Sequence, residues 1–162
     1  MMYGGNKVRN HFPKSYPNDL YDRIIADGAD HNTFDPVYRV AVSGEINRDT
    51  FLSTFEECTA QESSLVNRDL SLRQSTDDYD IGEYSVSFFE ERKHADRILK
   101  LKKKYNDGPV LIHGKILPEH GFSIMTKDSN DPKRKNKKDS HIDLWKYEDV
   151  DLTCLFTKME TQ

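Results

Sequence analysis

The stretch YSVSFFEERKHADRILKLKKKY (residues 84–105) decides the fold class, because its hydrophobic pattern changes period halfway along. Residues 84–89 alternate between the two faces of an extended chain. From 90 to about 105 the apolar residues recur at helical spacing, with acidic residues first and lysines last, as the helix dipole favours. A strand followed directly by a helix is therefore predicted here.

Elements of both kinds flank this stretch along the chain. Apolar and β-branched residues predict strands over 36–43, 110–116, 122–124, 141–147 and 150–157. Helical spacing predicts helices over 20–27 and 47–58. This mixture, with strands grouped in the last third, predicts the α+β class: a split, mainly antiparallel β-sheet core with two or three packed helices.

Length and composition bound the domain organisation. The chain has 162 residues, of which 35% are hydrophobic and 32% charged, and these values suit a single domain. Residues 1–16 predict a flexible N-terminal arm and residues 17–162 one α+β domain. Within that domain, residues 128–140 are rich in lysine and poor in apolar side chains, which predicts a mobile basic loop.

Composition also excludes several classes of protein. Two cysteines are too few for a disulfide-rich scaffold or a four-cysteine zinc site. A net charge of −4 excludes a globally basic nucleic-acid binder, although not a local basic patch. The sequence has neither an apolar run of membrane-spanning length nor a secretory leader, so we expect a cytoplasmic protein without membrane contact.

Arg39 is the first candidate site residue, because it interrupts the apolar strand predicted over 36–43. A buried guanidinium is costly unless an anion or a carboxylate meets it. Its planar fork binds two oxygens at once, which favours a phosphate or carboxylate clamp. A structural ion pair with one of the 28 acidic residues explains the same pattern, and the sequence leaves both interpretations open.

Ser85, Ser87 and Phe89 share the second face of the strand predicted over 84–89. Two hydroxyls on one face suit hydrogen bonds to a sugar, and the phenyl ring suits stacking on a flat ring. The alternative is an amphipathic strand whose polar face lies in water.

The strand predicted over 141–147 carries His141 and Asp143 on one face, and Glu148 follows at its end. Strand ends beside loops are common places for catalytic groups. A carboxylate there suits a ribose hydroxyl or a developing positive charge. An edge strand whose polar side chains deter pairing is the alternative.

Metal binding and nucleic-acid binding have weaker support in the sequence than a site built from the strand residues described above. His113, His120, His141 and Asp143 are spread over three segments without the spacing of a zinc motif, so we expect no metal. The lysines of 100–104 and the basic run 133–138 suit phosphate contacts. No aromatic residue interleaves with these lysines, as single-strand binding would favour.

Three short motifs, taken in order, resemble the Arg–Ser–Glu class of ADP-ribosyltransferase-like domains. They are the arginine strand 37–40, the serine strand 84–89 with its aromatic end, and the late triplet 146–148. The helix straight after the serine strand, followed by several short strands, is also similar. The resemblance covers roughly residues 36–157 and implies an ADP-ribosyltransferase-like fold.

The resemblance also implies an enzyme that uses NAD as a substrate and transfers ADP-ribose to a protein or nucleic-acid acceptor. In the catalytic set that it implies, Arg39 anchors the phosphates and Ser85 hydrogen-bonds in the nicotinamide-ribose pocket. Glu148 binds that ribose and stabilises the oxocarbenium-like transition state. The residues implied in NAD binding are Arg39, Tyr38, Ser85, Ser87, Phe88, Phe89 and His141.

Two positions depart from the family pattern. Val86 stands between the serines where the family usually has threonine, and Lys146 stands where an acidic residue or glutamine often precedes the catalytic Glu148. Lys146 would repel an arginine, which argues against an arginine acceptor. The small size favours a bacterial or phage effector or toxin, with a neutralising protein partner. The alternative function is a non-catalytic module that binds protein or nucleic acid through the basic loop.

Overall fold

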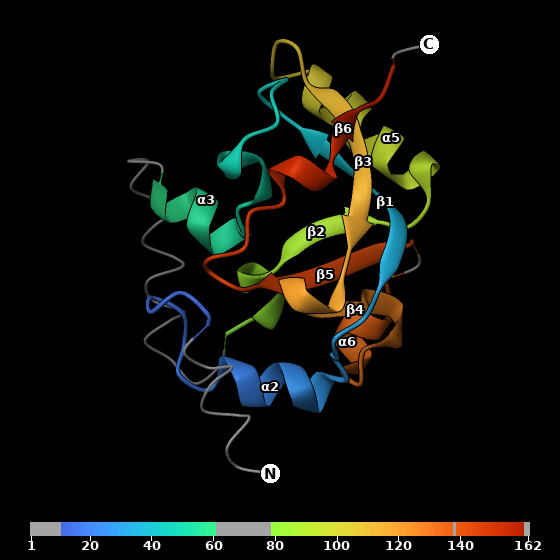
Figure 1. Cartoon of the computed structure of the whole chain (residues 1–162). Coiled ribbons are helices and arrows are strands. Elements are labelled where there is room, and N and C mark those ends of the chain that lie inside the picture. The colour runs from blue at the N-terminus through green and yellow to red at the C-terminus, as the bar shows by residue number, and fades with distance from the viewer. Residues whose placement is uncertain (1–10, 61–78, 138, 161–162) are drawn as a thin grey trace.

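The fold is a mixture of helix and strand, as a computed structural model of the chain shows (Figure 1). The structure describes residues 11–60, 79–137 and 139–160. Within these residues lie four α-helices: α2 (Leu20–Asp27), α3 (Thr54–Ala60), α5 (Arg92–Lys103) and α6 (Pro132–Lys135). The strands are β1 (Phe34–Ala41), β2 (Val86–Phe89), β3 (Val110–Ile116), β4 (Gly121–Met125), β5 (His141–Lys146) and β6 (Thr157–Lys158). The α+β class is thereby confirmed, with more helices than the two or three expected.

Short 3₁₀ helices connect several of these elements. They span Arg48–Phe51, Ile81–Tyr84, Pro118–His120, Thr126–Asp128 and Thr153–Leu155. The second of them takes up the first residue of the strand predicted over 84–89, so β2 begins two residues later than expected.

The six strands form one sheet in the order β4-β5-β2-β1-β3-β6, and each neighbouring pair is antiparallel. β2 pairs with β5 in continuous register, so Ser87 lies opposite Asp143 and Phe89 opposite His141. β1 pairs with β3 along most of its length. With β2 it shares one register position, where Tyr38 lies opposite Phe89. The sheet therefore opens between β1 and β2.

One face of the sheet carries an apolar core. Val37, Phe88 and Ile112 are fully buried on this face. Phe51 and Phe156 cover them from outside the sheet, with their ring centroids 4.9 Å apart. Burying these side chains supplies the main stabilisation of the sheet, at about 25 cal/mol for each Å² of apolar surface removed from water.

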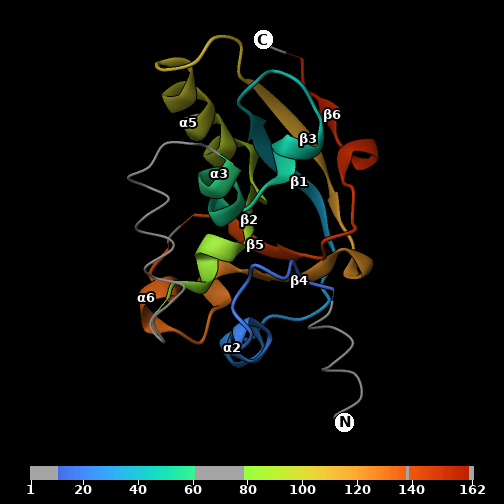
Figure 2. The same ribbon diagram turned by 90° about the vertical axis from the view of Figure 1, so that its left-hand side faces the viewer.

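The opposite face is covered at its two ends and leaves its middle to polar side chains. α5 packs on β1 and β3 at one end, with Ala95 and Leu99 buried. α2 packs near β4 at the other end, where Ile24 joins a core that includes Trp145 of β5. Figure 2 shows α5 and α2 well apart on the molecule. The polar face of β2 and β5 lies between them.

Part of the expected flexible arm, residues 1–16, packs into the core instead. Phe12 and Tyr16 are both buried. The Tyr16 hydroxyl lies 2.8 Å from Ser53 Oγ, and its ring packs edge-on against Tyr84. Two aromatic side chains therefore anchor residues 11–16 to the core. Residues 1–10 lie outside the described residues.

The expected mobile basic loop, residues 128–140, contains the short helix α6. The Asp131 side chain caps this helix by accepting a hydrogen bond of 2.9 Å from the Lys133 amide, and Pro132 occupies its first turn. Arg134 on this helix is only 12% exposed. The segment expected to be a mobile basic loop thus contains a short capped helix and one largely buried arginine; its Lys138 lies outside the described residues.

The strand expected over 150–157 is replaced by a turn. The Asp151 carboxylate accepts hydrogen bonds from the Thr153 amide at 3.0 Å and from the Thr153 hydroxyl at 2.8 Å. Such local bonds compete with strand pairing. A 3₁₀ helix follows over Thr153–Leu155, and β6 is left with two residues.

Candidate functional site

A groove runs over the polar face of β2 and β5, between α5 and α6. It consists of two adjoining cavities of about 540 and 280 Å³ that share Thr54, Ser87, Lys137 and His141. We call these two cavities together the sheet groove. Strand alternation turns Ser87 and His141 toward it, whereas Val86, Phe88 and Ile142 enter the apolar core on the other face.

Asp143 is the carboxylate at the bottom of the sheet groove. It lines the larger cavity and is only 2% exposed. Ser85 Oγ lies 2.6 Å from its Oδ1, and Thr126 Oγ1 lies 2.7 Å from its Oδ2. Arg134 donates to the same Oδ2. A buried carboxylate needs such partners to remain charged.

Arg134 forms the cationic wall of the same cavity. Its guanidinium forms ion pairs with Asp143, with Asp27 at 3.4 Å and with Asp80 at 3.6 Å. It also lies 5.7 Å from the centre of the Trp145 ring. Burial disfavours its charge, but the three carboxylates outweigh that effect and raise the pKa of Arg134. These ion pairs hold α6 against the sheet.

His141 lines both cavities of the sheet groove. Its Nδ1 lies 2.6 Å from Thr126 Oγ1, which also contacts Asp143. Burial lowers the pKa of His141, and the neighbouring carboxylate of Asp143 partly opposes that shift. His141 is therefore neutral at pH 7 and joins the hydrogen-bond network around Asp143.

Arg39 lines the smaller cavity, close to where β1 and β2 separate. Its Nε donates to the Thr50 carbonyl at 2.8 Å, and its Nη1 donates to the Ser87 carbonyl at 2.7 Å. Its Nη2 lies 3.6 Å from a carboxylate oxygen of Glu57, and the side chain is 14% exposed. Burial lowers the pKa of Arg39, an effect that Glu57 opposes. Each interpretation of Arg39 has an observation on its side. Its ion pair with Glu57 fits a structural role, and its place in the cavity lining fits a phosphate or carboxylate clamp.

The structure brings together part of the residue set expected from the sequence. Arg39, Ser85, Ser87, Phe89 and His141 all line the smaller cavity. The hydroxyl of Ser85 lies between Asp143 and the Gly82 carbonyl, which is 2.9 Å away.

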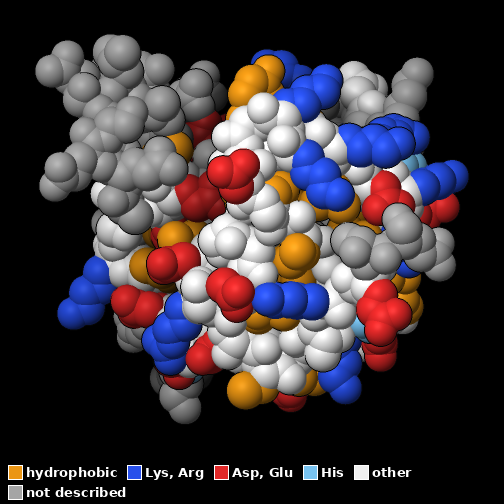
Figure 3. All heavy atoms as spheres, turned by 90° about the horizontal axis from the view of Figure 1, so that it is seen from above, with side chains coloured by type: hydrophobic (Ala, Val, Ile, Leu, Met, Phe, Trp, Pro, Cys, Tyr) orange, Lys and Arg blue, Asp and Glu red, His pale blue; other side chains and the backbone are white. Residues whose placement is uncertain are grey.

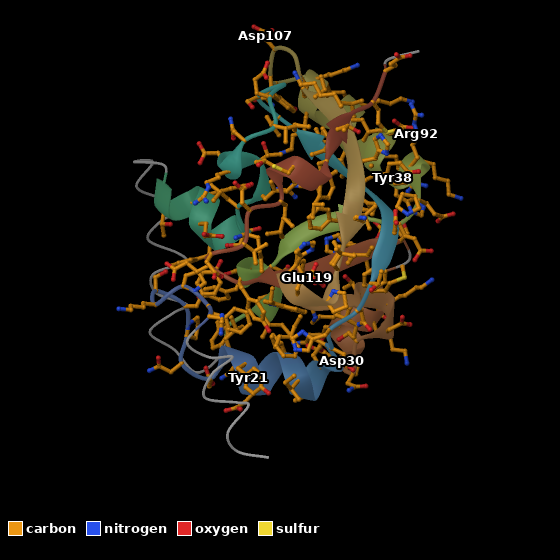
Figure 4. All side chains as sticks on the ribbon, in the orientation of Figure 1. Tyr21, Asp30, Tyr38, Arg92, Asp107 and Glu119 are labelled. Carbon is orange, nitrogen blue, oxygen red and sulfur yellow. The ribbon has the colours of Figure 1, made fainter. Side chains whose placement is uncertain are left out.

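Phe88 and Tyr38 lie away from this cavity. Phe88 is fully buried in the apolar core on the opposite face. Tyr38 packs against the cluster around α5, near which Figure 4 shows it. Strand alternation accounts for Phe88, which is one step from Ser87 and Phe89. Tyr38 lies opposite Phe89 in the register and packs beside it, but it does not line the cavity.

Glu148 lies outside the sheet groove. β5 ends at Lys146, and the Glu148 amide donates to the His11 carbonyl at 2.7 Å. Its side chain is exposed and lines a separate cavity of about 150 Å³ with Lys146 and Arg48. Leu52 borders both this cavity and that of Arg39. The strand carboxylate that contacts Ser85 is therefore Asp143.

The sequence did not predict that Asp143 and Arg134 belong to the same site as Ser85. Asp143 shares a strand face with His141, but only the register of β5 on β2 sets it beside Ser85. Arg134 reaches Asp27 and Asp143 through contacts between distant segments. For Arg134 the available signal was the sequence Asp131-Pro132, which is typical of a helix start.

The described residues contain no group of three or more His, Cys, Asp or Glu side chains suited to a metal ion. No helix in the same residues is both long and apolar enough to cross a membrane.

No protein-family model matches the chain, and neither a curated protein nor a solved structure matches it.

Proposed function

We propose that the protein is an ADP-ribosyltransferase-like enzyme that uses NAD, with Asp143 rather than Glu148 as its carboxylate. One observation carries the proposal: Ser85 Oγ lies 2.6 Å from Asp143 Oδ1, in the groove that Arg39 also lines. The arginine, serine and carboxylate that the sequence resemblance calls for thus meet in one groove once Asp143 takes the place of Glu148.

In the reaction, the bond between C1′ of the ribose and the nicotinamide nitrogen breaks. Nicotinamide leaves with the bonding electron pair, and the ribose becomes oxocarbenium-like. An acceptor hydroxyl or amine attacks C1′ and loses its proton to solvent. Asp143 stabilises the positive charge that develops on the ribose, an interaction that is strong in a water-poor site. ADP-ribose is thereby joined to the acceptor.

The hydrogen bonding of Asp143 leaves room for a ribose hydroxyl. Thr126 and Arg134 both bind Oδ2, whereas Ser85 alone of the described side chains binds Oδ1. A carboxylate oxygen accepts two hydrogen bonds, so Oδ1 keeps one acceptor site for a substrate hydroxyl.

The cations of the smaller cavity suit the diphosphate of NAD. Arg39, Lys102 and Lys137 line it, and Glu57 is the one carboxylate among the residues that line it. Charge-assisted hydrogen bonds to phosphate are roughly twice as strong as neutral ones. A diphosphate bound there lies beside the cavity that holds Asp143.

The alternative, a non-catalytic module that binds through the basic loop, loses one of its cations. Arg134 is held by three carboxylates inside the molecule, so it does not face a partner. Lys133 and Lys135 remain exposed.

The test measures NAD binding by calorimetry and the transfer of labelled ADP-ribose from NAD to macromolecules in a cell extract. The variant Lys102→Gln/Lys137→Gln removes two exposed cations of the groove. We expect it to bind NAD about 5–150-fold more weakly, because each of the two lost hydrogen bonds contributes about 0.5–1.5 kcal/mol net.

The matched control is Lys127→Gln/Lys135→Gln, which removes the same charge from exposed positions that line neither cavity of the groove. We expect it to bind NAD like the wild type. Absence of both NAD binding and label transfer in the wild type would overturn the proposed function.

A further inference from the structure

The C-terminal end of α5 carries a cluster of exposed lysines. Lys100, Lys102, Lys103 and Lys104 are all exposed. Earlier in the helix, Arg92 pairs with Asp96 and Lys93 with Glu91. In the described part of the chain, no ion pair within 4.0 Å involves these four lysines. Figure 3 shows Lys and Arg side chains at several places on the surface seen from above, with Asp and Glu side chains among them.

No aromatic residue lies between these lysines, but Tyr105 follows directly after them and is 80% exposed. Its amide donates to the Lys102 carbonyl at 3.1 Å, and the Asn106 amide donates to the same carbonyl at 3.0 Å. The turn therefore holds the tyrosine at a fixed place beside the lysines. The helix dipole favours cations at this end, but it gives no reason for an aromatic ring in water. The cluster thus has the two elements of a single-strand site, cations and a stacking surface.

The lysine cluster continues into the sheet groove. Lys102 and Ile98 of α5 line the smaller cavity together with Arg39 and Lys137. Leu101, one turn before Tyr105, is also exposed. A ligand that lies along the end of α5 therefore extends to the place where we put the diphosphate of NAD.

We propose that the end of α5, Lys100 to Tyr105, binds a single-stranded nucleic acid that is the acceptor of ADP-ribose. This proposal rests on the proposed function and names the acceptor. The lysines contact successive phosphates, and an unpaired base stacks on Tyr105. The strand then runs along α5 toward the groove, where one of its hydroxyl or amino groups attacks C1′ of the ribose.

A single strand fits this surface better than the alternatives. An acidic peptide offers carboxylates to the lysines, but it has no regularly spaced flat rings that could stack on the tyrosine. A duplex keeps its bases stacked on one another, so it cannot use the ring. Along the described end of α5 and the smaller cavity, two carboxylates oppose an anionic strand: Asp107, which is exposed just after Tyr105, and Glu57. The four lysines outnumber them.

The test measures binding of fluorescein-labelled 12-nucleotide single strands, RNA and DNA, by anisotropy across a range of salt concentrations. The variant Lys100→Gln/Lys103→Gln/Lys104→Gln removes three phosphate contacts. We expect its salt slope to fall by about 2, because each contact with a single strand contributes about 0.7. Between 1 M and 0.1 M salt, a slope that is smaller by 2 makes the variant bind the strand about 100-fold more weakly than the wild type at 0.1 M. Tyr105→Ala weakens binding about tenfold, and Tyr105→Phe keeps it, because stacking needs only the ring.

The matched control is Lys14→Gln/Lys127→Gln/Lys135→Gln, which removes equal charge from exposed positions elsewhere. We expect it to bind strands like the wild type. Equal losses in both triple variants, or equal binding of duplex or of polyglutamate, would overturn the proposal. Nicotinamide release without strand binding overturns the acceptor alone, whereas strand binding without nicotinamide release overturns the proposed enzyme and with it the acceptor role, leaving only a strand-binding surface.

Discussion

Replacing Arg134 with glutamine removes the cation that three carboxylates share. Asp27 and Asp143 are almost fully buried, at 4% and 2% exposure of their side chains. Removing one partner of a buried ion pair costs about 3–5 kcal/mol, because it leaves an uncompensated charge in the interior. Here each carboxylate keeps a hydroxyl donor, Ser129 for Asp27 and Ser85 for Asp143. We therefore expect the lower end, a loss of about 3 kcal/mol in the free energy of unfolding.

Urea unfolding measures this loss, with Arg92→Gln as the control. Arg92 forms an exposed pair with Asp96, four residues on in the same helix, with 43% and 41% of the side chains exposed. Such pairs contribute about 0.3–0.5 kcal/mol. The double variant Arg134→Gln/Asp143→Asn should lose less than the sum of the single variants, since the two residues contact each other. If Arg134→Gln lost no more than Arg92→Gln, the ion pairs would not be what holds α6 on the sheet.

Two further predictions concern pH and packing. Burial lowers the pKa of His141 below its ordinary 6.5, so the folded chain binds fewer protons than the unfolded chain just below that pH. The free energy of unfolding should fall as the pH drops through 6.5 toward the folded pKa, by up to about 1.4 kcal/mol per pH unit for this group. His141→Gln should flatten the plot of unfolding free energy against pH. A plot that this substitution leaves unchanged would refute the prediction. A methyl group at Gly114 would lie 2.7 Å from the Phe156 ring and against the Leu155 carbonyl. Gly114→Ala should therefore cost about 1–3 kcal/mol in urea unfolding, and a midpoint equal to that of Lys115→Ala would contradict the packing described.

Local patterns predicted the elements whose periodicity is strong. The alternation over 84–89 and the helical spacing after it correspond to β2, which begins two residues later than expected, and to α5, which is about two residues shorter at each end. The strand expected over 150–157 is wrong because one side chain, Asp151, offers the backbone a competing turn. Reading Asp151-x-Thr153 as a turn signal would have avoided that error.

The site depends on contacts between distant segments, and this is why the sequence predicted it only in part. Arg39, Ser85 and His141 were found because each departs from an apolar strand pattern. The choice between Asp143 and Glu148 depends on the register of β5 on β2 and on where β5 ends. In the sequence, Arg134 could not be told apart from the lysines around it. Its partner Asp27 is 107 residues away, so no local pattern indicated the ion pair. Period-two alternation indicates a face but does not say which strands pair.

The most direct test of the central claim compares nicotinamide release from NAD by the wild type, Asp143→Asn and Glu148→Gln, each first shown to be folded by thermal unfolding. The account predicts that Glu148→Gln releases nicotinamide at the wild-type rate, because its side chain lines a different cavity. It predicts that Asp143→Asn loses about 100-fold or more, as removal of one group that stabilises transition-state charge does elsewhere. Loss of release in Glu148→Gln with full release in Asp143→Asn would contradict the account.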